Sequence, residues 1–254
     1  MQQSSRIRGV LAPVVTPFTR DLSPDPERFI AHCRWLLGQN CGLAVFGTNS
    51  EANSLSVDER MALLDALLAA GLEPGRMMPG TGCCALTDTV RLTAHAVKAG
   101  CAGVLMLPPF YYKDVTDDGL YRHFAEVIER VGDARLRIYL YHIPPVAVVG
   151  ITPPLVERLM QRYPSAIAGM KDSSGDWNNT KTMLDTSRLR ASTCSPAAKR
   201  SCSPACDMAA PVASPPRLTS IPPRSTDSTV SGRVPTPTGS RRRSTRCARP
   251  SAST

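Results

Sequence analysis

The sequence contains no apolar stretch long enough to cross a membrane. No run in its 254 residues reaches the roughly 18 consecutive apolar residues that a transmembrane helix needs. The first residues, MQQSSRIRGVLAP, have neither the apolar stretch nor the small-residue cleavage site of a secretory signal. We therefore expect a cytoplasmic protein that is neither secreted nor inserted into a membrane.

Motifs for nucleotides and metals are also missing. No GxGxxG follows the first apolar run, and no phosphate loop occurs anywhere in the chain. None of the four histidines is spaced as a metal ligand, and the CxxxC pair Cys202 and Cys206 has no second pair. These absences argue against a nucleotide-binding sheet, and we expect no metal site.

Aromatic residues and acidic charge are scarce in the last part of the chain. The whole net charge of +9 comes from residues 185–254, because residues 1–184 carry equal numbers of basic and acidic side chains. Residues 185–254 contain no Phe, Trp or Tyr but 10 of the 23 prolines. Such a composition cannot bury enough apolar surface to offset its ordering entropy. We therefore divide the chain into a folded part, 1–184, and a disordered, basic Pro/Ser/Arg-rich tail, 185–254.

The folded part alternates apolar runs with amphipathic segments. Continuous apolar runs are typical of parallel strands buried on both faces, and they predict strands at 10–18, 42–47, 77–82, 102–109, 136–144 and 166–171. Helical spacing and a capping-box pattern at Ser56 and Glu59 predict helices between them. The expected helices cover residues 26–37, a segment after Ser56, 87–98, 118–131 and 154–162.

Strict alternation of strands and helices predicts an α/β fold with a parallel sheet, either a doubly wound open sheet or a (β/α)8 TIM barrel. Polar residues follow the expected strands: Thr48 to Glu51, Tyr111-Tyr112, Tyr141-His142 and Lys171-Asp172. In a barrel all of these strand ends meet at one face, where catalysis occurs. The barrel is therefore favoured, truncated after about six of its eight βα units.

Lys171 is the main candidate for chemistry. A lysine at the end of a buried strand is desolvated, which lowers its pKa and frees the amine to attack a carbonyl. The ordinary alternative is a lysine that leaves the sheet for solvent. Tyr141 could move protons for such an intermediate or simply cap the core, and Thr48 could bind a carboxylate or only open a turn.

Four motifs in this order carry a family resemblance: GTNSE after the second strand, PPFYYK, YHIPP and GMKDSSGD. Over residues 7–184 the chain resembles the dihydrodipicolinate synthase / N-acetylneuraminate lyase family of pyruvate-type class I aldolases. The resemblance implies a lyase in which Lys171 forms a Schiff base with pyruvate or another 2-oxo acid, without a cofactor. It also implies that Tyr141 is the acid/base, that Thr48 and Tyr112 complete a proton relay, and that Thr48 and Asn49 bind substrate.

The resemblance also implies a homotetramer built as a dimer of dimers, since the tyrosine matched by Tyr112 acts across a dimer interface in this family. The chain departs from the synthase pattern at Asn49, Ser50 and Val146. Synthases have arginine at the position of Val146, where it holds the carboxylate of the aldehyde substrate. Its loss weakens recognition of aspartate semialdehyde. The aldehyde or sugar-acid substrate therefore stays open.

The tail can be read in another frame. For residues 210–232 one can choose codons that, when read one base earlier, encode GAGCISATANVNPAAIDRLYREW. Codons for residues 194–209 can be chosen in the same way to encode LFAGSEAFLLAGMRHG. These strings supply two strand-like runs, each leading into a helix, and the first resembles the eighth-strand region of the family. We therefore interpret the tail as out of frame. The version with the tail read in this second frame is called the frame-restored chain below.

Two rival interpretations follow from the tail. A barrel without its last strands has open edges, so the chain as written is expected to be inactive, or a non-catalytic truncated barrel. A nucleic-acid-binding module would instead use Arg241–Arg243 and the rest of the tail, with an affinity that falls steeply with salt. We do not expect nucleic acid to be a partner, because the arginine cluster disappears in the second frame.

Overall fold

The computed structural model describes residue 7, residues 9–188 and residues 193–196 of the chain. All of them belong to the first of two compact units, Met1–Arg217. The second unit, Leu218–Thr254, lies outside the described residues, as does most of the tail defined above. No helix in the described part of the chain is long and apolar enough to span a membrane.

Within the described residues, six strands form two parallel sheets. β1 pairs with β2 in the first sheet, and the order of the second is β3-β4-β5-β6. Every pair is parallel, which confirms the expected α/β arrangement. The strands are β1 (Leu11–Pro13), β2 (Gly42–Ala44), β3 (Val104–Met106), β4 (Ile138–His142), β5 (Ile167–Asp172) and β6 (Thr193–Pro196).

The segment 77–81, predicted to be part of a strand, joins the two sheets. On one side its Met78 and Gly80 amides donate to the carbonyls of Leu43 and Val45, at 2.8 Å each. On the other side the Leu105 amide donates to the Pro79 carbonyl at 2.9 Å. The backbones approach so closely that a Cβ atom at Gly80 would lie 2.0 Å from the Phe46 oxygen, so only glycine fits. The strands therefore follow one another in chain order, as in a barrel wall.

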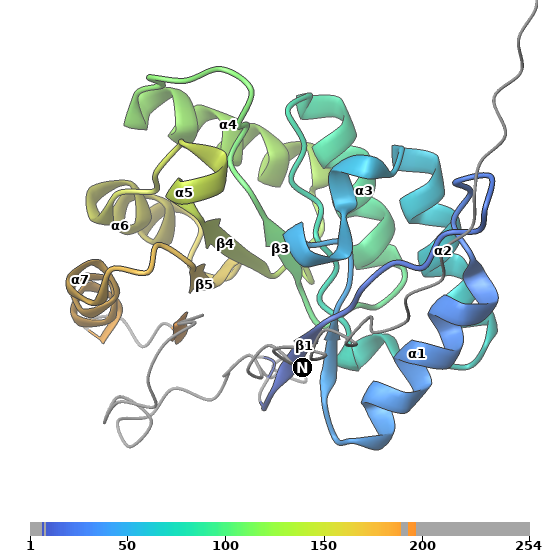
Figure 1. Ribbon diagram of the computed structural model, residues 1–254. Coiled ribbons are helices and arrows are strands. Elements are labelled where there is room, and N and C mark those ends of the chain that lie inside the picture. Colours follow the sequence, from blue (N-terminus) through green and yellow to red (C-terminus); the bar gives the residue numbers. More distant parts are fainter. Residues whose placement is uncertain (1–6, 8, 189–192, 197–254) are drawn as a thin grey trace, which may run out of the picture. The chain divides into compact units, whose positions relative to one another are not determined.

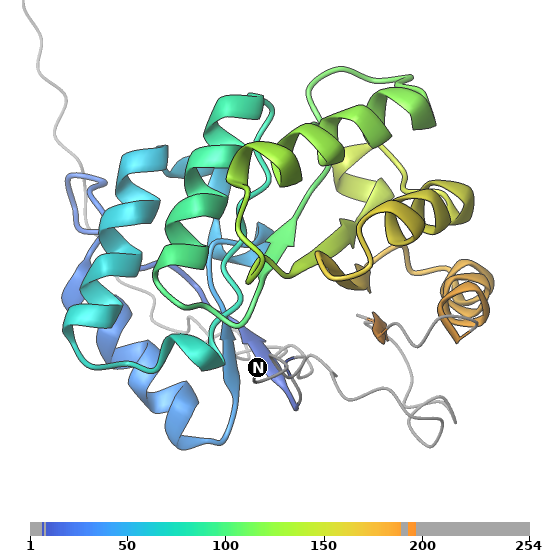
Figure 2. The same ribbon diagram turned by 180° about the vertical axis from the view of Figure 1, so that it is seen from behind.

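Helices connect the strands and lie on their outer side (Figures 1 and 2). Those predicted from spacing are confirmed to within one residue or two at each end. Short 3-10 turns and the short helix α5 occur in the loops. The helices are α1 (Pro26–Gly38), α2 (Val57–Ala69), α3 (Leu86–Lys98), α4 (Asp117–Val131), α5 (Pro144–Ala147), α6 (Pro153–Arg162) and α7 (Trp177–Arg188), and the turns are η1 (Thr48–Ser50), η2 (Ala52–Ser54) and η3 (Pro74–Arg76).

The strands bury both of their faces. A large cluster packs the helices against the outer face and includes Phe29, Phe124, Leu140 and Leu155. A smaller cluster takes side chains from successive strand segments, which lie together on the inner face: Leu11, Ala44, Met78, Leu105, Tyr139, Tyr141 and Ala168. Inward side chains from neighbouring parallel strands form such a layer inside a barrel. Two buried faces explain why the strands are continuous apolar runs.

Two elements lie at and beyond the predicted C-terminal boundary of the barrel. Helix α7 continues through position 184, and Thr193–Pro196 pairs with β5 as strand β6, with Lys171 opposite Ser195. The division of the chain at residue 184 stays a prediction. The main chain can extend a parallel ladder whatever its side chains are, which composition alone does not reveal. The rest of 185–254 lies outside the described residues.

The capping box predicted before α2 is confirmed. The Ser56 amide donates to Glu59 Oε2 at 2.7 Å, and the Glu59 amide donates to Ser56 Oγ at 3.2 Å. Replacing Ser56 with alanine is expected to lower the free energy of unfolding by about 1 kcal/mol. Urea denaturation of the frame-restored chain measures this loss. The control is Ser54→Ala, at an exposed position in η2. An equal loss in both variants would contradict the capping role.

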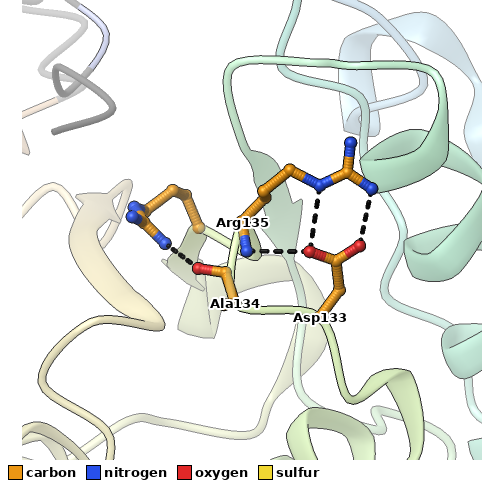
Figure 3. Close-up of polar contacts among 4 residues, drawn as sticks. Asp133, Ala134 and Arg135 are labelled. Atoms are coloured by element: carbon orange, nitrogen blue, oxygen red, sulfur yellow. Dashed lines mark hydrogen bonds and ion pairs between the residues drawn. The ribbon is translucent and has the colours of Figure 1, made fainter. Parts of the chain in front are cut away.

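A tight turn precedes β4 at the edge opposite the candidate site. Arg135 contacts both oxygens of Asp133, with Nε at 3.1 Å and Nη2 at 2.7 Å, and its amide adds a third hydrogen bond at 2.8 Å (Figure 3). These hydrogen bonds hold the pKa of Asp133 at about 2. Both side chains reach solvent, so the pair orders the turn and contributes little to stability.

Candidate functional site

The site forms where β4 and β5 end. Tyr141 and Lys171 are directly opposite each other in the parallel ladder. Tyr141 is buried, with 4% of its surface exposed, while Lys171 is half-buried. The Lys171 Nζ atom lies 4.3 Å from the centre of the Tyr141 ring, within the range of a cation–π contact. The ring thus holds the amine at the strand end, close to a phenol.

Thr48 reaches the same phenol from a third strand segment. It opens η1, which follows β2, and its hydroxyl donates to the Tyr141 hydroxyl at 3.4 Å. The structure therefore brings together Thr48, Tyr141 and Lys171, three of the residues that the sequence singled out. Parallel strands make this convergence possible, because their carboxyl ends lie at one edge.

The loop that carries Thr48 is held rigidly. Phe46 and Glu51, on either side, both adopt left-handed backbone angles, with φ of 57° and 56°, which is unusual for residues other than glycine. Ser50 is fully buried, and its carbonyl accepts a hydrogen bond from Thr16 Oγ1 at 2.8 Å. Such strain persists only where the surroundings fix the backbone. The Thr48 hydroxyl is thus presented at a fixed place beside Tyr141, and Asn49 is the next residue of η1.

Tyr112 does not join this group within the chain. Its side chain is 76% exposed, and its ring contacts Tyr111 edge-to-face at 5.2 Å between centroids. Among the contacts of the described residues, none joins Tyr112 to Thr48 or Tyr141. The relay role of Tyr112 therefore stays a prediction.

The loop after β3 is tied to α5 by Lys113. Its Nζ atom donates to the carbonyls of Phe110 and Ala147, the latter at 3.1 Å. Val146 in α5 is 60% exposed. The position that holds a carboxylate-binding arginine in synthases is thus an apolar side chain facing solvent.

Two residues beside the site were not predicted to have roles. Asp172 is buried and accepts hydrogen bonds from the Ser174 amide at 2.8 Å, Asn179 Nδ2 at 3.1 Å and Thr180 Oγ1 at 2.6 Å. It thereby fixes the turn that follows Lys171. The sequence signal that could have found it is the Asp-Ser-Ser-Gly turn, because an aspartate in such a turn commonly accepts from the amide two residues ahead. His142, the last residue of β4, is the second such residue, and its Nδ1 atom accepts a hydrogen bond from the Ile151 amide at 2.9 Å.

Buried cysteine thiols and clusters of metal-ligating side chains add little to the chemistry of the described residues. Burial raises the pKa of Cys33 and Cys101 to about 12 each, so these thiols are unreactive at neutral pH. In the part of the chain that the structure describes, no group of three or more His, Cys, Asp or Glu side chains could hold a metal ion. The chemistry available among these residues is that of an amine, a phenol and a hydroxyl.

Comparison with known proteins agrees with this geometry. The profile of the Dihydrodipicolinate synthetase family matches residues 6–193. The chain belongs to this family. A DapA-like lyase from Chloroflexus aurantiacus is 37% identical over 180 residues, which cover 70% of this chain and 60% of the relative. The chain therefore spans less than two thirds of that relative's length.

Solved structures of the family share the fold. The dihydrodipicolinate synthase from Agrobacterium tumefaciens superposes with a TM-score of 0.70 at 36% identity, covering 74% of this chain and 66% of that protein. A synthase from Acinetobacter baumannii complexed with pyruvate matches with a TM-score of 0.66 at 25% identity, covering 75% of this chain and 64% of that protein. The described residues thus correspond to the larger part of a family barrel.

Proposed function

We propose that this barrel is the scaffold of an aldolase-type lyase that forms a Schiff base between Lys171 and pyruvate or another 2-oxo acid. The observation that carries the proposal is the placement of Nζ 4.3 Å from the Tyr141 ring centre at the ends of two adjacent buried strands. The pyruvate bound to the Acinetobacter baumannii relative supports the choice of substrate.

The reaction begins when the Lys171 amine, after giving up its proton, attacks the substrate carbonyl. Loss of water from the resulting carbinolamine gives a protonated imine, which withdraws electrons from the adjacent carbon. Removal of a proton from that carbon by the acid/base gives an enamine, which can form a C–C bond with an aldehyde. In the reverse direction, loss of the proton from the hydroxyl group of the aldol cleaves the same C–C bond and leaves the enamine. The imine itself is the electron sink, so the mechanism requires no cofactor.

Tyr141 is the acid/base in this proposal. Its hydroxyl accepts a hydrogen bond from Thr48 at 3.4 Å, so Thr48 can orient the phenol and exchange protons with it. The Thr48 hydroxyl and the adjacent residue Asn49 are also proposed to bind the carboxylate of the 2-oxo acid. The rigid loop described above keeps these groups in place before substrate arrives.

The exposed Tyr111–Tyr112 pair supports assembly with a second copy. Tyrosines that expose about three quarters of their surface, as these do in the loop after β3, are typical of side chains that become buried in an interface. We propose that Tyr112 completes the relay of a partner protomer, in a dimer that pairs again to form a tetramer. Val146 in turn favours an aldehyde partner without a carboxylate at that position.

The proposal is tested by trapping the imine. Incubation of the frame-restored chain with pyruvate and borohydride is expected to add the mass of one reduced pyruvate per protomer. Peptide mapping is expected to place the adduct on Lys171 and not on Lys113, the other lysine near the site entrance. A chain that folds cooperatively but takes up no pyruvate would instead be a non-catalytic barrel.

A further inference from the structure

His142 is a buried ionisable side chain that the proposed reaction does not use. It is the last residue of β4, next to Tyr141, and only 6% of its surface is exposed. We propose that His142 is a positioning residue whose neutral imidazole holds the segment 143–152 against the end of β4 and so fixes Tyr141 and the entrance of the site. The catalytic part of this inference rests on the proposed function.

The imidazole is bonded to the far end of that segment. The Ile151 amide donates to His142 Nδ1 at 2.9 Å, which closes a loop of eight residues onto the strand end. A Cβ atom at Gly150 would lie 3.6 Å from His142 Cε1, so the chain passes directly beside the ring. The His142 carbonyl accepts a hydrogen bond from the Ser173 amide at 2.7 Å, which ties it to the turn after Lys171. His142 therefore connects the loops on both sides of the reacting groups.

The closed segment shapes the entrance. It contains α5, with exposed Val146 and with the Ala147 carbonyl that accepts the hydrogen bond from Lys113. Val148 has a left-handed backbone, with φ of 58°, although it is β-branched. Such a conformation is costly and persists only when neighbouring contacts hold it. The contact between Ile151 and His142 is the tether that closes this strained turn.

The tether works in only one protonation state. An Nδ1 atom that accepts a hydrogen bond carries no proton, so the neutral ring has its proton on Nε2. When Nδ1 is protonated it becomes a donor that faces the donor Ile151 N–H, and the bond is lost. The segment 143–152 has no ionisable side chain, and Asp172, opposite His142 on β5, is the charged group that acts on the ring.

The charge state at neutral pH follows from these surroundings. Burial lowers the pKa of His142, and the negative charge of Asp172 opposes this effect in part. The ring is therefore neutral and the tether intact above the ordinary histidine pKa of about 6.5. As the pH falls through the lowered pKa, the ring becomes charged and the tether opens.

Two replacements of His142 distinguish a positioning role, which needs the hydrogen-bond acceptor, from a packing role, which needs only the side-chain volume. In His142→Asn the side-chain oxygen can accept from Ile151 in place of Nδ1 but does not titrate. In His142→Leu the volume stays but the acceptor is lost. The rate of pyruvate trapping with cyanoborohydride is measured between about pH 5 and pH 8 on the full chain and the frame-restored chain, with folding checked by circular dichroism.

The expected pattern is specific. At neutral pH His142→Asn keeps the rate to within about threefold, whereas His142→Leu loses roughly 10²-fold, as small displacements of reacting groups do. In acid the trapping rate of the chain that keeps His142 falls more than that of His142→Asn. The inference is overturned if His142→Leu traps pyruvate as fast as the chain with His142. It is also overturned if the rate of His142→Asn falls in acid as much as that of the chain with His142.

A separate readout distinguishes this inference from the proposed function. Nitrogen NMR of the imidazole in the frame-restored chain is expected to show the Nε2–H tautomer at neutral pH. If no pyruvate is trapped but this tautomer is present and the Ile151 amide shifts when His142 is protonated, the proposed function fails and the tether stands. A ring that carries its proton on Nδ1 overturns the tether whatever the trapping shows.

Discussion

Replacing Lys171 with methionine is expected to lower the rate of aldol cleavage or condensation by at least about 10³-fold and to abolish pyruvate trapping, because no other group supplies the imine nitrogen. Methionine matches the length of the half-buried lysine stem, so the end of β5 should stay packed. The measurement is steady-state turnover together with the mass of the borohydride-treated frame-restored chain.

The matched control is Lys181→Met in helix α7. Lys181 is exposed and paired with Asp185 at 2.9 Å, and such surface pairs contribute little to stability. This variant should trap pyruvate at the natural rate. Trapping that survives in Lys171→Met, or that is lost equally in Lys181→Met, would show that the imine forms elsewhere or that trapping follows general instability.

Helices α1, α2, α3, α4 and α6 could be predicted closely because their signals are local, whereas α5 and α7 were not predicted. Asp25 and Ser56 cap α1 and α2 with their own side chains. Most strands were predicted longer than they are, although β5 has the predicted length, shifted by one residue. Strand length depends on which backbone groups a distant neighbour can reach, so the segment 77–81 makes only single bridges on each side. That information does not lie within any one segment.

The convergence of Thr48, Tyr141 and Lys171 could also be predicted, because parallel strands place their carboxyl ends together. The role proposed for His142 could not, since it depends on how the segment 143–152 returns to its strand. Ile151, nine residues after His142, meets the ring only because α5 and the strained Val148 turn the chain back. Tyr112 illustrates a different limit, because its proposed partners belong to another copy of the chain.

Strand β6 bears on the interpretation of the tail. It begins at Thr193, and the second reading frame places the strand-like run LFAGSE from position 194. The parallel ladder therefore continues at the position where the second frame encodes a strand-like run. The written sequence there, TCSP, is instead polar and ends in proline. Proline cannot donate to a ladder, so this edge is a poor template for a further strand.

Restoring the reading frame is expected to convert an unstable chain into a folded enzyme. Among the described residues, β1 pairs only with β2 and β6 only with β5, so a barrel wall of this length has two open edges. Open edges and an uncovered inner layer favour aggregation over a unique fold. The chain as written should therefore show no cooperative thermal transition and no turnover, whereas the frame-restored chain should show both.

The comparison is made by calorimetry and by pyruvate-dependent turnover, with Lys171→Met in the frame-restored chain as the inactive but folded control. A nucleotide reading of codons 180–195 supplies an independent check, because one base lost or two gained there would account for the change of frame. A cooperative transition and turnover in the chain as written would contradict the interpretation. The written tail would then have to close the barrel itself, and deleting residues 197–254 should abolish that activity.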